Sequence, residues 1–462
     1  MLPEAAFPPS VPSSSPGISA LLVDLYELTM AQSYVDEGMN EEAVFSLFVR
    51  HLPADRGYLV AAGLDDVLDY LERFSFTADE IAFLESTGRF TGRLLQRLAG
   101  LRFSGAVRAV PEGTLFFSEE PVLEVRAPIL EAQLVESVII NLIQLQTMVA
   151  TKAARCVTVS GGRQLVDFAL RRTHGPEPSI SVARASYLAG FDGTSNVLAG
   201  RRYGIPLAGT MAHSYIEAFP SEIEAFRAYA RAFPDTAVLL LDTYDTIEGA
   251  RNAASVGREL AASGHRLRGV RLDSGDIVSL SRAVRAILDE AGLSHAIIFA
   301  SGNVDEYAIE QAITAGAAIE GFGVGTRMGV SADRPYLDIA YKLVSYAGRP
   351  TLKLSEDKIS LPGAKQVWRK GSEASFESDW LGLAHEAAPD GAEPLLVDVM
   401  AGGRRLAEPE SLDRMRARCR QGLALLPAEC RRLRYPDQYP VTPSAALVAL
   451  QRDTTAGISR RH

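Results

Sequence analysis

Aspartates follow two apolar runs of this sequence in closely similar contexts. Asp242 and Asp245 lie in LLLDTYDT, and Asp273 and Asp276 lie in RLDSGD. If both runs are neighbouring parallel strands, their carboxyl ends meet at one edge of the sheet. Mg²⁺ prefers oxygen ligands of this kind and commonly uses one or two carboxylates plus substrate phosphates. Each aspartate is equally suited to cap the helix that follows it, so both interpretations stay open.

A histidine occupies a comparable place after the apolar run IPLAGT. His213 follows Thr210 by three residues and precedes Glu217 by four, which puts His213 and Glu217 on one face of a predicted helix. Histidine at such a place can act as acid, base or nucleophile toward phosphorus. A structural or surface histidine is the alternative. Arg271, beside the second acidic cluster, is suited to a carboxylate or a phosphate.

Two further segments have the composition of anion-binding sites. VDFALRR places Phe168, Arg171 and Arg172 together, which suits a flat anionic ring or a phosphate, although a core phenylalanine with surface arginines would look the same. GFGVGT (321–326) has three glycines at alternate positions, and small residues let backbone N–H groups approach a phosphate. It lacks the Lys-Ser/Thr of a P-loop. Together with the aspartates, these segments predict an enzyme that handles a phosphorylated sugar and a metal ion.

The elements that must position these residues repeat one pattern between about 160 and 360. A short apolar run ends in a small or polar residue and a helical stretch follows; the runs end at Phe168, Thr210, Thr243, Asp276, Asn303 and Thr326. Marker residues of successive units are 29, 31, 28 and 24 positions apart; they are His213, Asp242, Asp273, Ser301 and Gly325. A (β/α)₈ barrel uses roughly 31 residues per unit. The spacing favours a barrel, complete or partial, over a doubly wound open sheet.

The remaining segments predict mixed helices and strands. We expect helices at 21–35, 64–72 and 130–154, strands at 43–50 and within 103–128, a loop and strand at 354–369, and helix within 403–435. The segment AGFDGTSN (189–196) is suited to begin a helix capped by Asp192, Thr194 or Ser195.

Bulk properties restrict the class of protein. The chain has 462 residues, a net charge of −10 and 23% charged residues, which argues against a nucleic-acid binder but leaves room for a small anionic substrate. The sparse cysteines Cys156, Cys419 and Cys430 have no metal-type spacing and suit a reducing compartment. The Pro/Ser-rich start is unlike a secretory signal, and the most apolar long stretch, 129–150, is interrupted by polar residues. We expect a cytoplasmic protein that does not enter membranes.

The motifs DLYELTMAQ, DFALRR, GFDGTSN, AGTMAHS, LLDTYDT, GVRLDSGD, GFGVGT and KLSEDK, in this order, resemble the nicotinate phosphoribosyltransferase family. The resemblance runs from about residue 21 to residue 369. It implies an α/β protein: an incomplete (β/α) barrel with a second α/β domain formed from the N- and C-terminal parts. On this basis we expect the accessory domain at 19–150 plus about 365–462 and the barrel at 151–364. The Pro/Ser-rich composition of 1–18 predicts a disordered tail there. The resemblance also implies a homodimer with active sites at the interface.

The reaction implied by the resemblance joins nicotinate to 5-phosphoribosyl 1-diphosphate (PRPP), forming nicotinate mononucleotide and diphosphate. It would be the first step of NAD biosynthesis from nicotinate, driven by ATP hydrolysis, dependent on Mg²⁺ and classed as a ligase reaction. His213 would be the histidine that ATP phosphorylates. Asp242 and Asp273 would lie near the metal and the ribose.

Substrate-binding roles are implied in the same way. Tyr26 and Phe168 would sandwich the pyridine ring, with Tyr26 supplied by the second subunit, and Thr210 and Arg271 would hold the carboxylate. The residues implied for PRPP and its phosphates are Arg171, Ser195, Gly302, Gly323, Gly325 and Thr326.

Two alternatives remain at this point. Nicotinamide-specific relatives are expected to place an aspartate near the amide, whereas FDGTSN offers Ser195, which favours a carboxylate substrate. A phosphoribosyltransferase that uses nicotinamide or quinolinate is nevertheless the nearest rival. A non-catalytic binding protein on the same barrel is the other.

Overall fold

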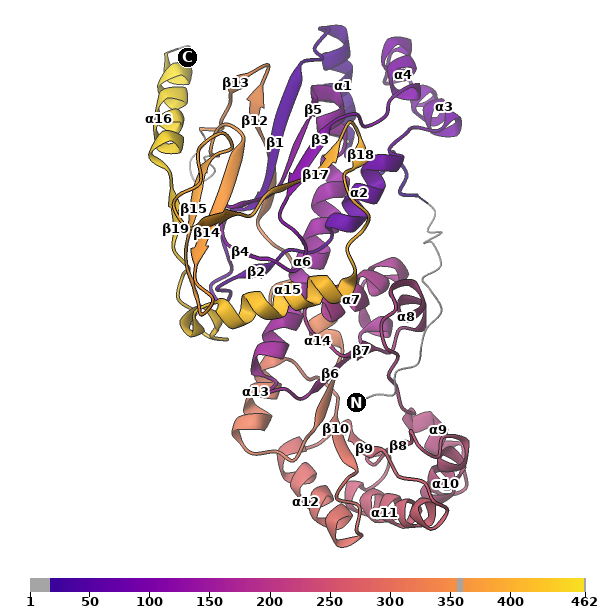
Figure 1. The fold of residues 1–462 in the computed structure, drawn as a ribbon. Coiled ribbons are helices and arrows are strands. Elements are labelled where there is room, and N and C mark those ends of the chain that lie inside the picture. Colours follow the sequence, from indigo (N-terminus) through magenta and orange to yellow (C-terminus); the bar gives the residue numbers. More distant parts are fainter. Residues whose placement is uncertain (1–16, 355–359, 461–462) are drawn as a thin grey trace. The chain divides into compact units, whose positions relative to one another are not determined.

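The computed structural model describes residues 17–354 and 360–460, and these form two compact units (Figure 1). One unit contains Thr151–Pro335, and the other combines the described residues of Ser14–Ala150 and Tyr336–His462. The tail predicted at 1–18 lies almost wholly outside the described residues, as does most of KLSEDK.

The Thr151–Pro335 unit is built on one parallel sheet. Its six strands are β6 (Gln164–Asp167), β7 (Gly193–Thr194), β8 (Val238–Leu240), β9 (Gly269–Leu272), β10 (Ile297–Ala300) and β11 (Gly321–Val324). Their order is β7-β6-β11-β10-β9-β8, and every pairing is parallel. Among the described residues the end strands β7 and β8 do not pair with each other, so the barrel is open. The predicted fold class, an incomplete (β/α) barrel beside a second α/β domain, is confirmed.

Helices follow the strands of this sheet. They are η1 (Leu170–Arg172), α7 (Pro176–Leu188), α8 (Val197–Tyr203), α9 (His213–Glu217), α10 (Glu222–Ala232), α11 (Thr246–Ala262), α12 (Ile277–Glu290), α13 (Glu306–Thr314) and α14 (Thr326–Gly329). Asp245 caps α11 and Asp276 caps α12, each accepting two backbone N–H bonds in the first turn. Asp242 and Asp273 precede these caps and are free for other roles.

Two local predictions for this unit were wrong. The run IPLAGT forms no strand and contributes only an isolated bridge between Leu207 and Thr194. The segment AGFDGTSN leads into a helix, but the predicted cap at Asp192, Thr194 or Ser195 is wrong: the segment contains the short strand β7, and α8 is capped by Asn196. Both segments lie at the end of the sheet, where a few long-range hydrogen bonds decide the conformation.

The second unit carries three sheets. Its N-terminal elements are α1 (Leu25–Asp36), β1 (Glu42–Val49), β2 (Leu59–Val60), α2 (Leu64–Arg73), α3 (Ala78–Ser86), α4 (Gly92–Ala99), β3 (Ala106–Ala109), β4 (Leu115–Phe116), β5 (Pro121–Pro128), α5 (Ile129–Leu134) and the part of α6 (Glu136–Val159) up to Ala150. Its C-terminal elements are β12 (Ile339–Tyr346), β13 (Arg349–Pro350), β14 (Lys365–Gly371), β15 (Phe376–Leu383), β16 (Ala392–Pro394), β17 (Val397–Ala401), β18 (Arg404–Arg405), α15 (Leu412–Leu425), η2 (Ala428–Arg431), β19 (Val441–Pro443) and α16 (Ala445–Ser459).

Strands from both ends of the chain share one sheet in this unit. In the seven-stranded order β13-β12-β1-β5-β3-β17-β18, the three N-terminal strands are flanked on both sides by C-terminal strands. Because β12 pairs with β1, residues from Tyr336 onward belong to this unit, whereas the sequence suggested a boundary at about 364. Within 403–435, for which we predicted helix, the α-helix covers only Leu412–Leu425.

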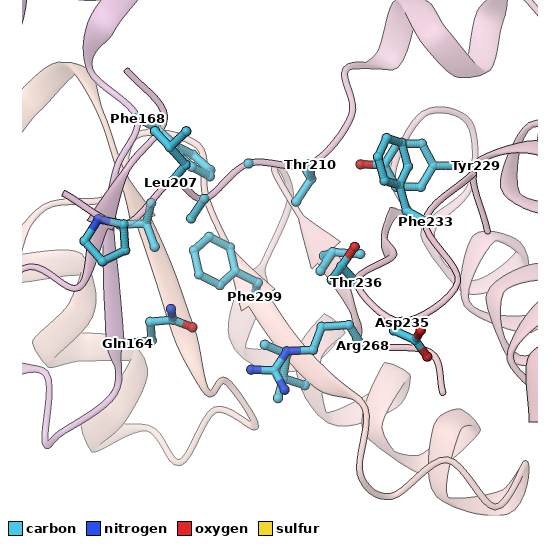
Figure 2. A pocket seen from close by; sticks show the side chains of 16 residues that line it. Gln164, Phe168, Leu207, Thr210, Tyr229, Phe233, Asp235, Thr236, Arg268 and Phe299 are labelled. Carbon is cyan, nitrogen blue, oxygen red and sulfur yellow. The ribbon is translucent and has the colours of Figure 1, made fainter. Parts of the chain in front are cut away.

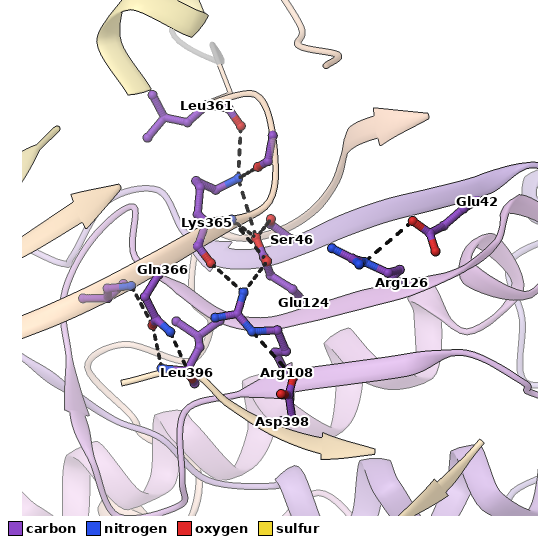
Figure 3. A network of polar contacts seen from close by, with 12 residues as sticks. Glu42, Ser46, Arg108, Glu124, Arg126, Leu361, Lys365, Gln366, Leu396 and Asp398 are labelled. Carbon is purple, nitrogen blue, oxygen red and sulfur yellow. Dashed lines mark hydrogen bonds and ion pairs between the residues drawn. The ribbon is translucent and has the colours of Figure 1, made fainter. Parts of the chain in front are cut away.

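A buried ionic cluster joins the two ends of the chain within this unit (Figure 3). Glu124 on β5 accepts hydrogen bonds from the Ser46 hydroxyl at 2.6 Å and the Lys365 backbone N–H at 3.0 Å. The Lys365 ammonium donates to the carbonyls of Leu361 and Gly363. Burial lowers the pKa of Lys365 to about 8, although Glu124 opposes the shift. Buried charges are tolerated only with such partners, so the cluster fixes β14 against β5.

Within residues 17–354 and 360–460, every helix is too short or too polar to traverse a lipid bilayer.

Candidate active site

Most of the predicted site residues lie at the carboxyl edge of the parallel sheet. Phe168 follows β6, Arg271 ends β9, and Asp242 and Asp273 follow β8 and β9. Thr210 and His213 follow the bridge at Leu207. Since all these segments run in one direction, their ends converge at a single edge, which is where barrel enzymes build active sites.

Arg271 and Thr210 form the most sharply defined contact of the site. The Arg271 Nη1 donates to the Thr210 hydroxyl at 2.6 Å, and its Nη2 lies 3.7 Å from Asp273. The Nε of Arg271 is buried and has no hydrogen-bond partner among the described residues. Burial lowers the pKa of Arg271, and the nearby Asp273 and Asp242 partly oppose this effect. A buried guanidinium with an unused donor is suited to an added anion.

His213 is the first residue of α9 and is oriented by a contact that the sequence did not suggest. Its Nδ1 lies 3.1 Å from the Thr243 hydroxyl, and its Nε2 lies 3.9 Å from Asp273. The imidazole is partly exposed, with 39% of the side chain accessible. The Thr243 contact engages Nδ1, which leaves Nε2 as the nitrogen open to a reaction partner.

The Asp242 and Asp273 carboxylates are held by neighbouring loops. Asp242 Oδ2 accepts hydrogen bonds from the Asp273 backbone N–H at 3.2 Å and from the Ser274 hydroxyl. Asp242 Oδ1 is buried without a hydrogen-bond partner among the described residues. Asp273 accepts a hydrogen bond from Ser301 and faces His213. The structure therefore brings these two carboxylates together, as the sequence predicted.

The described residues contain no group of three or more His, Cys, Asp or Glu side chains arranged to hold a metal ion. Mg²⁺ does not require such a cage, because it retains waters and uses phosphate oxygens of the substrate. The unused oxygen of Asp242 and the adjacent Asp273 are compatible with that kind of binding.

Phe168 lies between two pockets and owes its position to glycine. A Cβ at Gly323 would lie 2.5 Å from the Phe168 ring, and a Cβ at Gly325 would lie 3.1 Å from the Phe168 carbonyl oxygen. Only glycine at 323 lets the ring lie this close to β11. Packing against Phe168 thus accounts for Gly323 independently of the phosphate role predicted for it. Thr326 is exposed at the start of α14.

Gly302 packs against the loop that carries Asp273. Its φ is +83°, and a Cβ there would meet the Asp273 carbonyl oxygen at 1.9 Å. The loop after β10 therefore packs directly on the loop that carries Asp273.

Arg171 and Ser195 line a pocket of about 520 Å³ at this edge, together with Phe168, Thr210 and Arg271. Among the described residues that line it there is no aspartate or glutamate. The buried carboxyl of Asp167, next to Phe168, is engaged by the Thr194 hydroxyl and the Ala169 N–H, which both donate to it. Burial raises the pKa of Asp167 to about 6. The pocket is consequently cationic.

A second cavity, of about 540 Å³, shares Phe168 and Thr210 with this pocket and extends into the open barrel, along residues of β6, β8 and β10 (Figure 2). Tyr229 of α10 lines it on the side of Thr210. Burial raises the pKa of Tyr229, so its hydroxyl remains a donor. Sequence reasoning missed Tyr229, which lies in no motif. It placed Thr243 and Ser301 at strand ends but gave neither of them a role in the site.

Tyr26 belongs to the other unit. It lies on α1, 47% exposed, beside a small pocket that also includes Asp24 and Glu136. Burial, and next the charge of Glu136, raise its pKa. The predicted stacking of Tyr26 on the pyridine ring stays a prediction.

Comparisons with known proteins agree along the whole chain. Models of the nicotinate phosphoribosyltransferase N-terminal domain, family and C-terminal domain match residues 21–144, 163–365 and 384–451. The chain is 48% identical over 435 residues to a nicotinate phosphoribosyltransferase of Mycobacterium tuberculosis, which covers 93% of each protein. It is 34% identical to the nicotinate phosphoribosyltransferase of Homo sapiens, with 97% of this chain and 99% of the relative covered.

Solved structures give the same result. The crystal structure of human nicotinic acid phosphoribosyltransferase has a TM-score of 0.85 and 32% identity, covering 93% of this chain and 99% of the human chain. A nicotinate-nucleotide pyrophosphorylase from Pyrococcus furiosus has a TM-score of 0.71 at 23% identity, covering 87% and 95% of the two chains, and supports the fold alone.

Proposed function

The chain belongs to the nicotinate phosphoribosyltransferase family, and from that premise we propose that it couples its reaction to ATP hydrolysis through His213. The reaction joins nicotinate to PRPP and releases diphosphate, and its product, nicotinate mononucleotide, serves NAD biosynthesis. The ATP coupling, the magnesium ion and the residue roles below belong to the proposal.

Nicotinate binds with its carboxylate on Arg271 and Thr210 and its ring on Phe168. The observation that carries this assignment is the buried Arg271 Nε without a partner, next to the 2.6 Å contact with Thr210. A carboxylate supplies the missing acceptor and compensates the buried positive charge. Tyr229, on the Thr210 side of the adjoining cavity, is a further donor near this position.

The charge of the pocket favours nicotinate over nicotinamide. Arg171 and Arg271 line it, and no acidic side chain does so among the described residues. An amide would leave the guanidinium of Arg271 without a charged acceptor, whereas a carboxylate satisfies it. Ser195 in the same pocket neither repels a carboxylate nor demands an amide.

PRPP is assigned to the rest of this edge. Arg171 contributes charge to its phosphates; the other proposed contacts are Ser195, Gly302, Gly323, Gly325 and Thr326. Asp242 and Asp273 would hold Mg²⁺, which supplies charge stabilisation for the departing diphosphate. Glycosyl transfer breaks the bond from the ribose anomeric carbon to the diphosphate oxygen and forms a bond from that carbon to the pyridine nitrogen. The arginines stabilise the negative charge that develops on the leaving group.

His213 receives the γ-phosphoryl group of ATP, releasing ADP. Nε2 is the proposed nucleophile, because Nδ1 is engaged by Thr243. The phosphoryl group adds negative charge beside the PRPP site and changes the affinities for PRPP and diphosphate. Hydrolysis of the phosphohistidine then returns the enzyme to its initial state, so ATP drives product formation.

The proposal includes a homodimer, in which Tyr26 of one subunit reaches the site of the other, and a cytoplasmic location. The location is supported by Cys156, Cys419 and Cys430, which are buried free thiols, as expected in a reducing compartment.

Phosphohistidine formation is tested directly by incubating the purified chain with γ-³²P-labelled ATP. The expected result is an acid-labile, base-stable label on the peptide that contains His213. The label and the ATP stimulation of product formation should both vanish in His213→Ala. His295→Ala, which changes an exposed histidine of the same unit, is the matched control and should behave as the wild type. Labelling that persists in His213→Ala would overturn the assignment.

A further inference from the structure

The cavity inside the parallel sheet has a second end, away from the residues assigned to nicotinate. It starts at Phe168 and Thr210 and reaches Gln164, Val238 and Ile297, which are the first residues of β6, β8 and β10 (Figure 2). The second end therefore lies at the amino edge of the sheet. Strands of four residues separate the two edges by about 13 Å.

An arginine without a partner lines this second end. Arg268 immediately precedes β9 and is half-buried, and within the described part of the chain its guanidinium makes no hydrogen bond or ion pair. Asp235 lines the same cavity, but its carboxylate pairs with His265 at 3.0 Å. The side-chain amide of Gln164 also has no hydrogen-bond partner among the described residues. Neither group is engaged by the protein, so both are available to hydrogen-bond to a ligand that enters the cavity, and a guanidinium favours a carboxylate.

The walls between the two ends are apolar and flat. Phe299 is 7% exposed and lines the cavity beside Ile297. Its ring lies 5.8 Å from that of Phe168, centre to centre, and separates the two ends. Figure 2 shows Phe299 between the Phe168 side and Arg268. Small-molecule sites commonly combine an apolar lining with a few polar groups that fix orientation.

The amino edge is open to solvent on the side of α10. Phe233 is 49% exposed, and Asp235 and Thr236 beside it are exposed as well. These three residues line the cavity and precede β8. A small molecule can therefore enter here without passing the Arg271 end.

We propose that the amino end of this cavity is a second binding site for a small aromatic monocarboxylate, with the carboxylate on Arg268 and Gln164 and the ring on Phe299. One cation at the end of an apolar cavity matches a flat molecule that carries one negative charge. The site is separate from the nicotinate position at Arg271 and does not depend on the ATP coupling proposed above.

Benzoate tests this proposal, because it has the ring and the carboxylate but no ring nitrogen to react. Equilibrium dialysis of labelled benzoate against the full chain should give two sites per chain. Arg268→Gln should lose the amino-edge site, with affinity falling about tenfold or more, and Arg271→Gln should lose the other. Arg266→Gln removes the same charge from an exposed residue outside the cavity and should keep both sites. One site in the wild type, or two sites in Arg268→Gln, overturns the proposal.

Arg268→Lys provides a second, more conservative variant in case Arg268→Gln does not fold. Lysine keeps the charge but loses the planar fork, so benzoate should bind the amino-edge site more weakly than in the wild type. Crystals soaked with 4-bromobenzoate should show anomalous density between Phe299 and Arg268. Density confined to the Arg271 end, or unchanged affinity in Arg268→Lys, contradicts the assignment.

Discussion

Replacing Thr210 with valine tests the assignment of the carboxylate site. Valine keeps the shape of threonine but removes the hydroxyl that accepts the Arg271 Nη1 bond at 2.6 Å. The Arg271 side chain is only 12% exposed, so water does not readily replace this contact. A hydrogen bond to a charged group contributes about 1.5–3 kcal/mol. Since 1.4 kcal/mol corresponds to a factor of ten, we expect KM for nicotinate to rise about 10- to 100-fold.

The assay is the initial rate of nicotinate mononucleotide formation, with nicotinate varied at saturating PRPP. Because the contact acts on the bound carboxylate before and during transfer, kcat and KM for PRPP should change little. Thr314→Val alters an exposed threonine on α13 and is the matched control. A folded Thr210→Val enzyme with KM for nicotinate within twofold of the wild type would refute this placement.

Three other substitutions probe the surroundings of the site. Gly302→Ala places a Cβ 1.9 Å from the Asp273 carbonyl oxygen at a φ of +83°. The resulting strain, about 1–3 kcal/mol or more, should lower both Tm and kcat. A melting curve like that of the wild type would contradict the close packing. Asp167→Asn should alter the pH dependence of stability: burial raises the pKa of Asp167 to about 6, so its contribution is present at acidic pH and lost as pH rises through 6. Between pH ~4 and ~6, denaturant titrations should therefore show the free energy of unfolding of the wild type falling relative to that of the variant, by at most about 1.4 kcal/mol per pH unit. A difference between the two proteins that stays constant over this range would exclude a raised pKa of Asp167. Asp242→Asn should raise the Mg²⁺ concentration needed for half-maximal activity at least about tenfold. Asp276→Asn exchanges one good helix cap for another and should leave that concentration unchanged. Equal effects of the two substitutions in a Mg²⁺ titration would contradict the assignment of Asp242 to the metal.

The acidic pairs show what sequence reasoning can and cannot separate. Both pairs follow strands, and the strand ends were predictable from the alternation of apolar runs and helical stretches. Only the three-dimensional structure shows that Asp245 and Asp276 cap helices whereas Asp242 and Asp273 do not. In the sequence, the two kinds of aspartate stand three residues apart in the same motif. The local pattern contains no information on which oxygen remains unpaired.

Segments decided by long-range pairing were the least predictable. The bridge at Leu207 and the two-residue strand β7 depend on partners far away in sequence. The same holds for site residues to which sequence reasoning assigned no role. Thr243 positions His213 across a separation of 30 residues, and Ser301 reaches Asp273 across 28. The pairing of β12 with β1, which moves residues after 335 into the second unit, joins segments almost 300 residues apart.

This chain transfers phosphoribose to nicotinate, and we propose that it recognises the carboxylate and couples the reaction to ATP hydrolysis. The most direct measurement presents nicotinate, nicotinamide and quinolinate together with PRPP and Mg²⁺, with and without ATP, and separates the mononucleotides by chromatography. We predict nicotinate mononucleotide as the dominant product, formed faster and to a greater extent with ATP. Preferential formation of nicotinamide mononucleotide, or no product from any of the three, would contradict the account.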